Sequence, residues 1–556
     1  MYFLKKFHLK IFFLLWFVFN LIQAGTTELF HDEAYYWVYS KFPDWGYFDH
    51  PPMIALLIKA GYFLFPNELG VRFFIVILNV CTLGIVYQLL PKKNDTLFYA
   101  IAFSAAILQI GGILAVPDVP LVFFVALFFL AYRDFIRNMT VINALILGVV
   151  MALMLYTKYH GILVIFFTFL SNPSLALKPR AYLAAFTGAL LFLPHLIWQY
   201  NHQFPSVLYH LVERNASEYH ISYTLEYLLG QLFLPGPLMG WLLIWASICY
   251  KTENALERAL KFTMVGVYIF FLVSTLKGRV EANWTVPVLI PLMILGHQYL
   301  FDQHRWRTVL TRSTWISIVL VVILRFYLAV DIAPSNRISK DEFHKNRQWA
   351  NSITKETGGV PVTFINSYQR ASKYWFYSGI PAFSLNTPVY RRNNYNYWPI
   401  ENVLLGKRVA ALSPYYYKYY SDSIFTARGT TGMRMVDSFY SFSRIKIEST
   451  KVLEVKNGSI QQCRLRFSTE QSSLDVLQTE PVGSLPVKLV ITLGDSITNS
   501  FATGITLSQI TKMDQTFIAD FPVSLSSGKH EACFSIPTSL PIDPSLNSSP
   551  IILKVQ

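Results

Sequence analysis

Long apolar segments recur through the first three-fifths of the chain and stop near residue 330. Windows of about 17–25 mostly apolar residues can cross the roughly 30 Å hydrocarbon core of a membrane as helices. Such windows run from Phe12 to Val330 and end before Asp331. The pattern predicts about eleven membrane-spanning helices. Their expected starts lie near residues 10, 71, 97, 119, 141, 160, 181, 224, 262, 284 and 313.

The segment from Thr26 to Leu69, between the first two predicted spans, is too polar to cross a membrane. Its pieces Glu33–Ser40 and Pro52–Leu64 have helical composition with one apolar face. We expect two short helices that lie along the membrane interface. A loop of this kind can form a roof over a cavity.

The pattern changes twice after the last span. Residues 334–445 mix charged and aromatic positions with short apolar runs, which indicates a small mixed α/β domain. Residues 446–556 lose helical periodicity and show short alternating segments separated by Ser, Gly, Asn and Pro, the pattern of a β-sandwich. We therefore predict three domains, with residues 1–333 as the transmembrane domain.

Composition agrees with an integral membrane protein, since 53% of the residues are hydrophobic. The formal net charge of +14 does not indicate nucleic-acid binding, because Lys and Arg lie in short connections between apolar runs. These connections alternate along the chain, from Lys5 and Lys6 to Arg305 and Arg307. The positive-inside rule then places the amino terminus in the cytoplasm and the region after Pro334 outside. We expect an integral plasma-membrane protein with a periplasmic or extracytoplasmic carboxy-terminal region.

Two features of processing and redox state stay open. The first apolar run ends near Ala24 and Gly25, so a cleavable signal peptide is an alternative to a first span. Cys463 and Cys533 lie in the predicted outside tail, where a disulfide between them is an expectation.

Four polar clusters lie at predicted helix ends or loops, and the predicted topology places all of them outside. Carboxylates there could take a proton from a hydroxyl, and cations could stabilise a leaving phosphate. The chain shows neither a P-loop nor a Gly-rich nucleotide fingerprint, so a donor embedded in lipid is favoured. The clusters are His31-Asp32-Glu33, Asp49-His50-Pro51-Pro52, Pro117-Asp118-Val119-Pro120 with Lys158, and Lys277 to Asn283.

These motifs resemble the bacterial protein mannosyltransferase and aminoarabinose transferase superfamily, which has the GT-C fold. The first outside loop carries the strongest similarity, in His31 to Trp37 and Asp44 to Met53. Further matches follow in the family's order: Val71-Arg72, Pro117 to Pro120, Thr157-Lys158-Tyr159, Lys277-Gly278-Arg279, Glu281 to Trp284, and Tyr368 to Ser372. The resemblance covers about residues 10 to 410, and the tail after Lys446 looks unfamiliar.

The resemblance implies an inverting transferase that moves a sugar from a polyprenyl-phosphate donor to a hydroxyl on protein, lipid or glycan. Asp32 would be the general base, Glu33 would organise the site, and Asp118 would position acceptor or loop. Lys158, Lys277 and Arg279 would hold the donor phosphate. The other substrate-binding candidates are Tyr47, Asp49, His50, Tyr159, Glu281, Asn283, Tyr368 and Gln369.

One departure concerns the acceptor and the metal. The aminoarabinose branch of the family looks to have the residues Glu-Lys-Pro at the positions where this chain has Asp49-His50-Pro51. This difference weakens the case for lipid A as the acceptor. Asp49 and His50 could also bind a divalent metal, because carboxylate and imidazole suit zinc or manganese. The sequence leaves the cofactor undetermined.

Other interpretations remain beside these. Asp32, Glu33 and Asp118 are also ordinary helix-capping residues, and Lys158 could extend to the lipid headgroups. The main functional alternative is a transporter or flippase of lipid-linked sugars, which would predict paired inverted halves that the chain does not show. A membrane-anchored adhesion protein would leave the first-loop motif unexplained.

Overall fold

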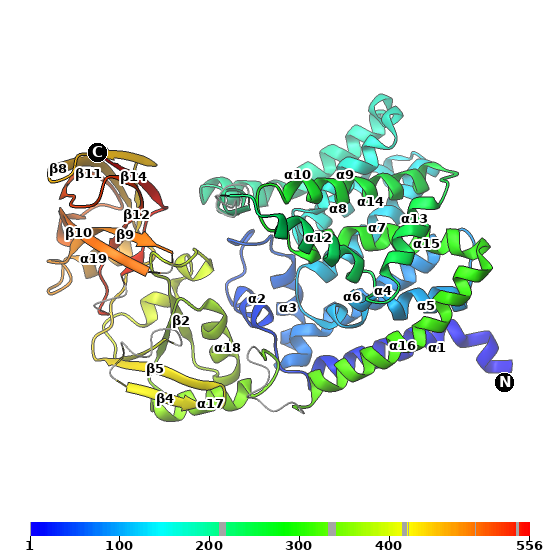
Figure 1. Ribbon diagram of the computed structural model, residues 1–556, viewed down its shortest axis with the longest axis horizontal. Coiled ribbons are helices and arrows are strands. Elements are labelled where there is room, and N and C mark those ends of the chain that lie inside the picture. The colour runs from blue at the N-terminus through cyan, green and yellow to red at the C-terminus, as the bar shows by residue number, and fades with distance from the viewer. Residues whose placement is uncertain are drawn as a thin grey trace. The chain divides into compact units, whose positions relative to one another are not determined.

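The computed structural model divides the chain into two compact units, Met1–His344 and Lys345–Gln556. It describes residues 2–210, 218–331, 341–413, 420, 422–494, 496–540 and 544–556. The first unit is helical and the second is built around β-sheets (Figure 1). Each unit is considered by itself below.

The first unit consists of helices joined by short connections and one polar loop. The 3₁₀ segments are η1 (Gly111–Ile113), η2 (Pro173–Leu177) and η4 (Ala282–Val288). The α-helices are α1 (Tyr2–Thr26), α2 (His31–Lys41), α3 (Met53–Leu64), α4 (Glu68–Leu89), α5 (Asp95–Ser104), α6 (Ala106–Gln109), α7 (Asp118–Arg137), α8 (Val141–Thr157), α9 (Gly161–Leu170), α10 (Pro179–Asn201), α11 (Pro205–Leu208), α12 (Ile221–Phe233), α13 (Gly240–Cys249), α14 (Ala255–Ser274), α15 (Leu289–Asp302) and α16 (His304–Ala329).

Many of these helices suit a membrane. Among the described residues, six helices are long and apolar enough to span one, and α5 with the segment 106–113 adds a span bent by 78°. Every predicted start falls on a helix or one residue before it. The membrane character is thus confirmed, whereas the total of about eleven spans stays a prediction. Helices α2 and α3 lie where two short loop helices were expected.

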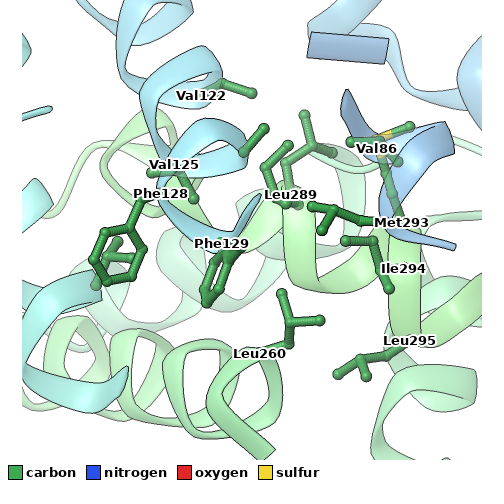
Figure 2. Close-up of a cluster of buried hydrophobic side chains, with 14 of the residues drawn as sticks. Val86, Val122, Val125, Phe128, Phe129, Leu260, Leu289, Met293, Ile294 and Leu295 are labelled. Carbon is green, nitrogen blue, oxygen red and sulfur yellow. The ribbon is translucent and has the colours of Figure 1, made fainter. Parts of the chain in front are cut away.

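The core of the first unit forms where α4, α7, α14 and α15 meet (Figure 2). On α7, Val122, Val125 and Phe129 follow the three- and four-residue spacing that places side chains on one helical face. They are buried with Leu260 of α14 and Met293 of α15. This packing fixes the start of α7, where Asp118 lies.

The turn from α3 to α4 brings two helices into backbone contact. A Cβ atom on Gly61 would lie 2.2 Å from the carbonyl oxygen of Gly70, and one on Gly70 would lie 1.8 Å from the carbonyl oxygen of Phe65. The side chain of Asn67 caps α4 by accepting from the amide of Gly70 at 3.3 Å. Only glycine allows this approach.

The second unit begins with a mixed five-stranded sheet in the order β2-β1-β3-β5-β4. Strand β1 pairs in parallel with β2 and β3, while β5 is antiparallel to β3 and β4. Helices α17 (Asn346–Glu356) and α18 (Tyr368–Ser378) belong to this part. The strands are β1 (Val362–Ile365), β2 (Ala382–Leu385), β3 (Val409–Ser413), β4 (Asp422–Thr426) and β5 (Gly429–Val436).

The remaining strands form a six-stranded and a three-stranded sheet around a shared apolar core. The predicted strand-rich carboxy-terminal region is confirmed, whereas its boundary at 445/446 stays a prediction. A short helix, α19 (Gln471–Leu477), accompanies them. The strands are β6 (Lys446–Glu448), β7 (Val452–Val455), β8 (Ile460–Ser468), β9 (Pro486–Leu493), β10 (Ser496–Thr506), β11 (Asp514–Pro522), β12 (Gly528–Ile536), β13 (Ser545–Leu546) and β14 (Ile551–Val555).

The expected disulfide between Cys463 and Cys533 is wrong, because both thiols are free. Cys463 lies on β8 in the three-stranded sheet and points into the shared core. Cys533 lies on β12 in the six-stranded sheet, where its neighbours Ala532 and Phe534 point into that core. Adjacent strand residues face opposite sides, so Cys533 points away from Cys463.

Candidate functional site in the helical unit

The first turn of α2 is held by a buried ion pair. Glu33 and Arg72 are both fully buried, and the Nη2 and Nε atoms of Arg72 donate to the two carboxylate oxygens at 2.5 and 2.6 Å. Glu33 also accepts from the amide of Phe30 at 2.9 Å and from that of Ala115 at 2.8 Å. All four bonds use the carboxylate as a structural acceptor, which leaves it unsuited to removing a substrate proton.

Arg72 completes this junction with three backbone carbonyls. Its Nη1 donates to Ala24 and Thr27 at 3.0 and 2.6 Å, and its Nη2 donates to Glu28 at 3.1 Å. Together with the bonds to Glu33, these contacts use all five donors of the guanidinium group. Arg72 thus ties the end of α1 to the start of α2.

Asp32 precedes Glu33 on the same turn but is only half-buried. Acidic residues at a first helical turn are stabilised by the helix dipole. Glu33 bonds both to Arg72 and to the amide of Ala115, so the position of Asp32 relative to the loop at Ala115 is fixed. The arrangement presents one accessible carboxylate beside one immobilised carboxylate.

A second cluster joins three of the sequence candidates. The Nζ atom of Lys158 donates to Oδ1 of Asp118 at 2.8 Å, and Nδ2 of Asn283 donates to Oδ2 at 3.2 Å. Asp118 begins α7, Lys158 ends α8 and Asn283 lies in η4. Lys158 and Asp118 are both buried, so a phosphate that binds this ammonium group must compete with Asp118.

A cavity of about 130 Å³ adjoins this cluster. Four polar residues are among those that line it: Asp118, Asn283, and Asn79 and Thr82 of α4. The rest of the lining is largely apolar and comes mainly from the segment 107–116, which follows the bend after α5. The bent helix therefore creates space next to the Asp118 carboxylate.

The loop after α2 places Asp49 among tyrosines. The hydroxyls of Tyr35 and Tyr39 donate to Oδ2 of Asp49 at 3.1 and 3.3 Å. Burial is the main cause that raises the pKa of Tyr39 well above its usual value, with nearby Tyr35 and Asp49 contributing. Tyr47 is buried too, its pKa raised by burial, and its hydroxyl donates to the carbonyls of Tyr39 and Phe42.

A buried hydrogen-bond chain connects this loop to α10. Nδ1 of His195 donates to the carbonyl of Trp45 at 2.7 Å, which leaves Nε2 to accept from the hydroxyl of Tyr159 at 3.0 Å. Gln199 donates to Tyr159 at 2.9 Å and to Ser206 at 2.7 Å, and Ser206 donates to the Tyr47 carbonyl at 3.0 Å. The loop and the Lys158-Tyr159 turn are thereby held together.

Part of the chain is similar in sequence to known proteins. Residues 49–198 match the family described as dolichyl-phosphate-mannose-protein mannosyltransferase. The lipid A galacturonosyltransferase RgtD of Rhizobium johnstonii is 24% identical over 290 residues, which are 50% of this chain and 61% of RgtD.

Structural comparison agrees with the sequence comparison. Two crystal structures of ArnT from Cupriavidus metallidurans, apo and bound to undecaprenyl phosphate, match with TM-scores of 0.55 and 0.54 at 14% identity. Each covers 77% of this chain and 98% of the ArnT chain. The chain therefore has the ArnT-like GT-C fold.

The other expected site residues of this GT-C-fold protein differ in their exposure and in the elements that carry them. Arg279 is exposed and pairs with Glu226 at 3.1 Å, and Lys277 is exposed as well. Glu281 is half-buried just before η4. Tyr368 and Gln369 begin α18 in the second unit, where Nη2 of Arg391 donates to the Tyr368 hydroxyl at 2.8 Å.

The two metal candidates from the sequence, Asp49 and His50, both contact aromatic residues. The Asp49 carboxylate accepts from two tyrosines, and His50 packs edge-on against Tyr36. Within the described residues, the metal-ligating side chains that gather in a group of three are Asp331, Asp341 and His344. The sequence analysis did not single out this group.

His195, Gln199 and Asn79 were also missed as site residues. Each is a polar residue inside an otherwise apolar helix, which is costly in a membrane unless the side chain is satisfied or functional. That signal was available in the sequence, but the partners of these side chains were not.

Proposed function

We propose that this chain is an inverting glycosyltransferase that moves a sugar from a polyprenyl-phosphate donor to a hydroxyl group of a lipid acceptor. One observation carries the proposal: Glu33 bonds to Ala115, in the loop that leads into Asp118. This contact connects the turn that bears Asp32 with the cavity wall that bears Asp118 and Asn283. Lys158 adjoins that wall through its bond to Asp118.

The chemistry needs one base and stabilisation of a leaving phosphate. Asp32 takes the proton of the acceptor hydroxyl as the sugar carbon is attacked, and the donor phosphate departs from the opposite face. Lys158 exchanges its contact with Asp118 for one with the phosphate. There its positive charge stabilises the negative charge that develops on the leaving group. Asn283 keeps Asp118 in place during this exchange.

The relatives support both substrates of this proposal. RgtD acts on lipid A, and an ArnT structure contains undecaprenyl phosphate. By analogy we propose a polyprenyl-phosphate donor and a lipid acceptor, with the site at the outer face of the plasma membrane. The sugar is a hexose or pentose, to be identified by testing a panel of donors.

The test uses membranes that contain the full chain, lipid A, and radiolabelled polyprenyl-phosphate sugars. Wild-type protein should transfer label to the lipid acceptor. Asp32→Asn keeps the size and polarity of the side chain on the first turn of α2, so it should bind donor but lose transfer by at least about a hundredfold.

Two results would overturn this proposal. Near-normal transfer by a folded Asp32→Asn protein would remove Asp32 as the base. Movement of the intact donor lipid between leaflets, without label reaching any acceptor, would instead favour a flippase.

A further inference from the structure

Three potential metal ligands meet where the chain leaves α16. Carboxylate oxygens of Asp331 and Asp341 and a ring nitrogen of His344 lie within 4.8 Å of one another. His344 is buried and Asp341 is half-buried, whereas Asp331 is exposed. One imidazole and two carboxylates form a ligand set used by Zn²⁺ and by other divalent transition metals.

The imidazole ring of His344 is oriented by a group outside the cluster. Its Nε2 lies 2.7 Å from the carbonyl oxygen of Tyr327, near the end of α16, and a carbonyl can only accept a hydrogen bond. Nδ1 lies 2.7 Å from Oδ2 of Asp341. Metal-binding histidines commonly donate one ring N–H to a backbone carbonyl, which directs the other nitrogen toward the ion.

The residues between Asp341 and His344 pack against the start of the helix that bears Asp32. The rings of Phe343 and Phe30 are stacked at 5.6 Å. Glu342 lies 3.9 Å from Nε2 of His31. Both contacted residues directly precede Asp32, so the placement of residues 341–344 bears on the placement of that carboxylate.

We propose that Asp331, Asp341 and His344 bind one divalent transition-metal ion, best matched by Zn²⁺, which fastens residues 341–344 against the first turn of α2. Three protein ligands hold the ion and a water completes a tetrahedral shell. The proposed role of the ion is to fasten the two segments that supply its ligands. Bound in this way, it links the end of α16 to the segment that covers Phe30 and His31. The metal site is independent of the proposed transfer, and only its effect on transfer rests on the proposed function.

Metal binding is tested on the full chain, purified in detergent, stripped with a chelator and titrated with Zn²⁺. Elemental analysis should find one zinc per chain. Removing a ligand should weaken binding by more than the roughly 10–100-fold typical of losing an outer-shell partner, so His344→Gln and Asp341→Asn should each exceed that range. Asp331→Asn provides a third ligand variant at an exposed position, where a folding defect is least expected.

His530→Gln is the matched control. Nε2 of His530 also donates to a backbone carbonyl, that of Ser526, at 2.8 Å, but His530 is not part of the three-ligand group. This variant should bind zinc like the wild type. Unchanged zinc content in all three ligand variants would overturn the site, as would loss of zinc in Asp49→Asn with retention in the ligand variants.

Hydrogen exchange separates the fastening role from binding alone. Zinc should slow exchange at residues 30–33 and 341–344 in the wild type but not in His344→Gln. Zinc binding without this protection would refute the fastening of α2. Because neither measurement uses sugar transfer, their outcomes are distinct from failure of the proposed function.

Discussion

Asp32 and Glu33 are adjacent carboxylates in unlike surroundings. Glu33 is fully buried and accepts four hydrogen bonds, whereas Asp32 is half-buried on the same helical turn. A base must reach its substrate, and an anchor must not move. In the proposed mechanism Asp32 meets the first demand and Glu33 meets the second.

Loss of the buried anchor should destabilise the helical unit. In Glu33→Gln the charge of Arg72 stays buried without its counter-ion, and breaking such a pair typically costs about 3–5 kcal/mol. We expect a marked fall in the thermal unfolding midpoint of the protein in detergent. The double variant Glu33→Gln/Arg72→Met should recover part of that loss, and a single variant as stable as the wild type would contradict the anchor role.

The thiols of the second unit should react slowly. Burial raises the pKa of Cys463 and of Cys533 to about 11. At pH 8 both thiols are therefore protonated, and alkylation needs the thiolate. Mass spectrometry after iodoacetamide treatment should find both unmodified in native protein and modified in denaturant, with labelling of native protein rising toward pH 11. A disulfide would block labelling in denaturant without reductant.

At the residue scale the sequence pointed to candidate residues but not to their contacts. Motif spacing pointed to Asp118, Lys158 and Asn283 as candidates, and the structure brings their side chains together. The sequence did not indicate that Lys158 forms an ion pair with Asp118, or that Arg279 forms one with Glu226. Such partners depend on helices far apart in the chain, so local pattern carries no signal for them.

Among helices, the contact of α3 with α4 is sensitive to side-chain size. Gly61→Ala places a methyl group 2.2 Å from the Gly70 carbonyl, so the backbones must separate. Overpacking of this kind costs about 1–3 kcal/mol. Gly84→Ala, also on α4, is the matched control, since its added Cβ meets nothing within 4 Å. Thermal unfolding should show a loss for the first variant alone, and equal midpoints would refute the tight contact.

Helix positions followed from hydrophobic periodicity, but the bend did not. The span expected near residue 97 is broken after Ser104, with the following segment turned by 78°. The apolar pattern continues across the break, so periodicity alone predicts one straight helix. Tertiary contacts hold the bend: Asn79 donates to the Leu108 carbonyl at 3.3 Å and Arg325 donates to that of Gln109 at 2.6 Å.

At the scale of the whole molecule, the basic connections predict which side of the membrane each unit occupies. With the amino terminus inside and an odd number of spans, the second unit is outside. A reporter active only in the cytoplasm, fused after Gln556, should be silent, while the same reporter fused after Lys93 should be active. A strong cytoplasmic signal from the first fusion would mean that a span was miscounted.

Division into a helical and a strand-rich unit also followed from the change in pattern. The two compact units of the structure meet at 344/345, and the domain boundary at 333/334 stays a prediction. Residues 341–344 contact α2 and α16, which keeps them with the helical unit. Long-range packing of this kind leaves no trace in local composition.

The chain of hydrogen bonds through His195 constrains how this protein can evolve. Every proton along Ser206, Gln199, Tyr159 and His195 has one assigned acceptor. Replacing Tyr159 by Phe removes both a donor and an acceptor and leaves His195 and Gln199 short of a partner in a buried setting. Lineages that lose one member should therefore drift at the others as well, so these positions are expected to covary.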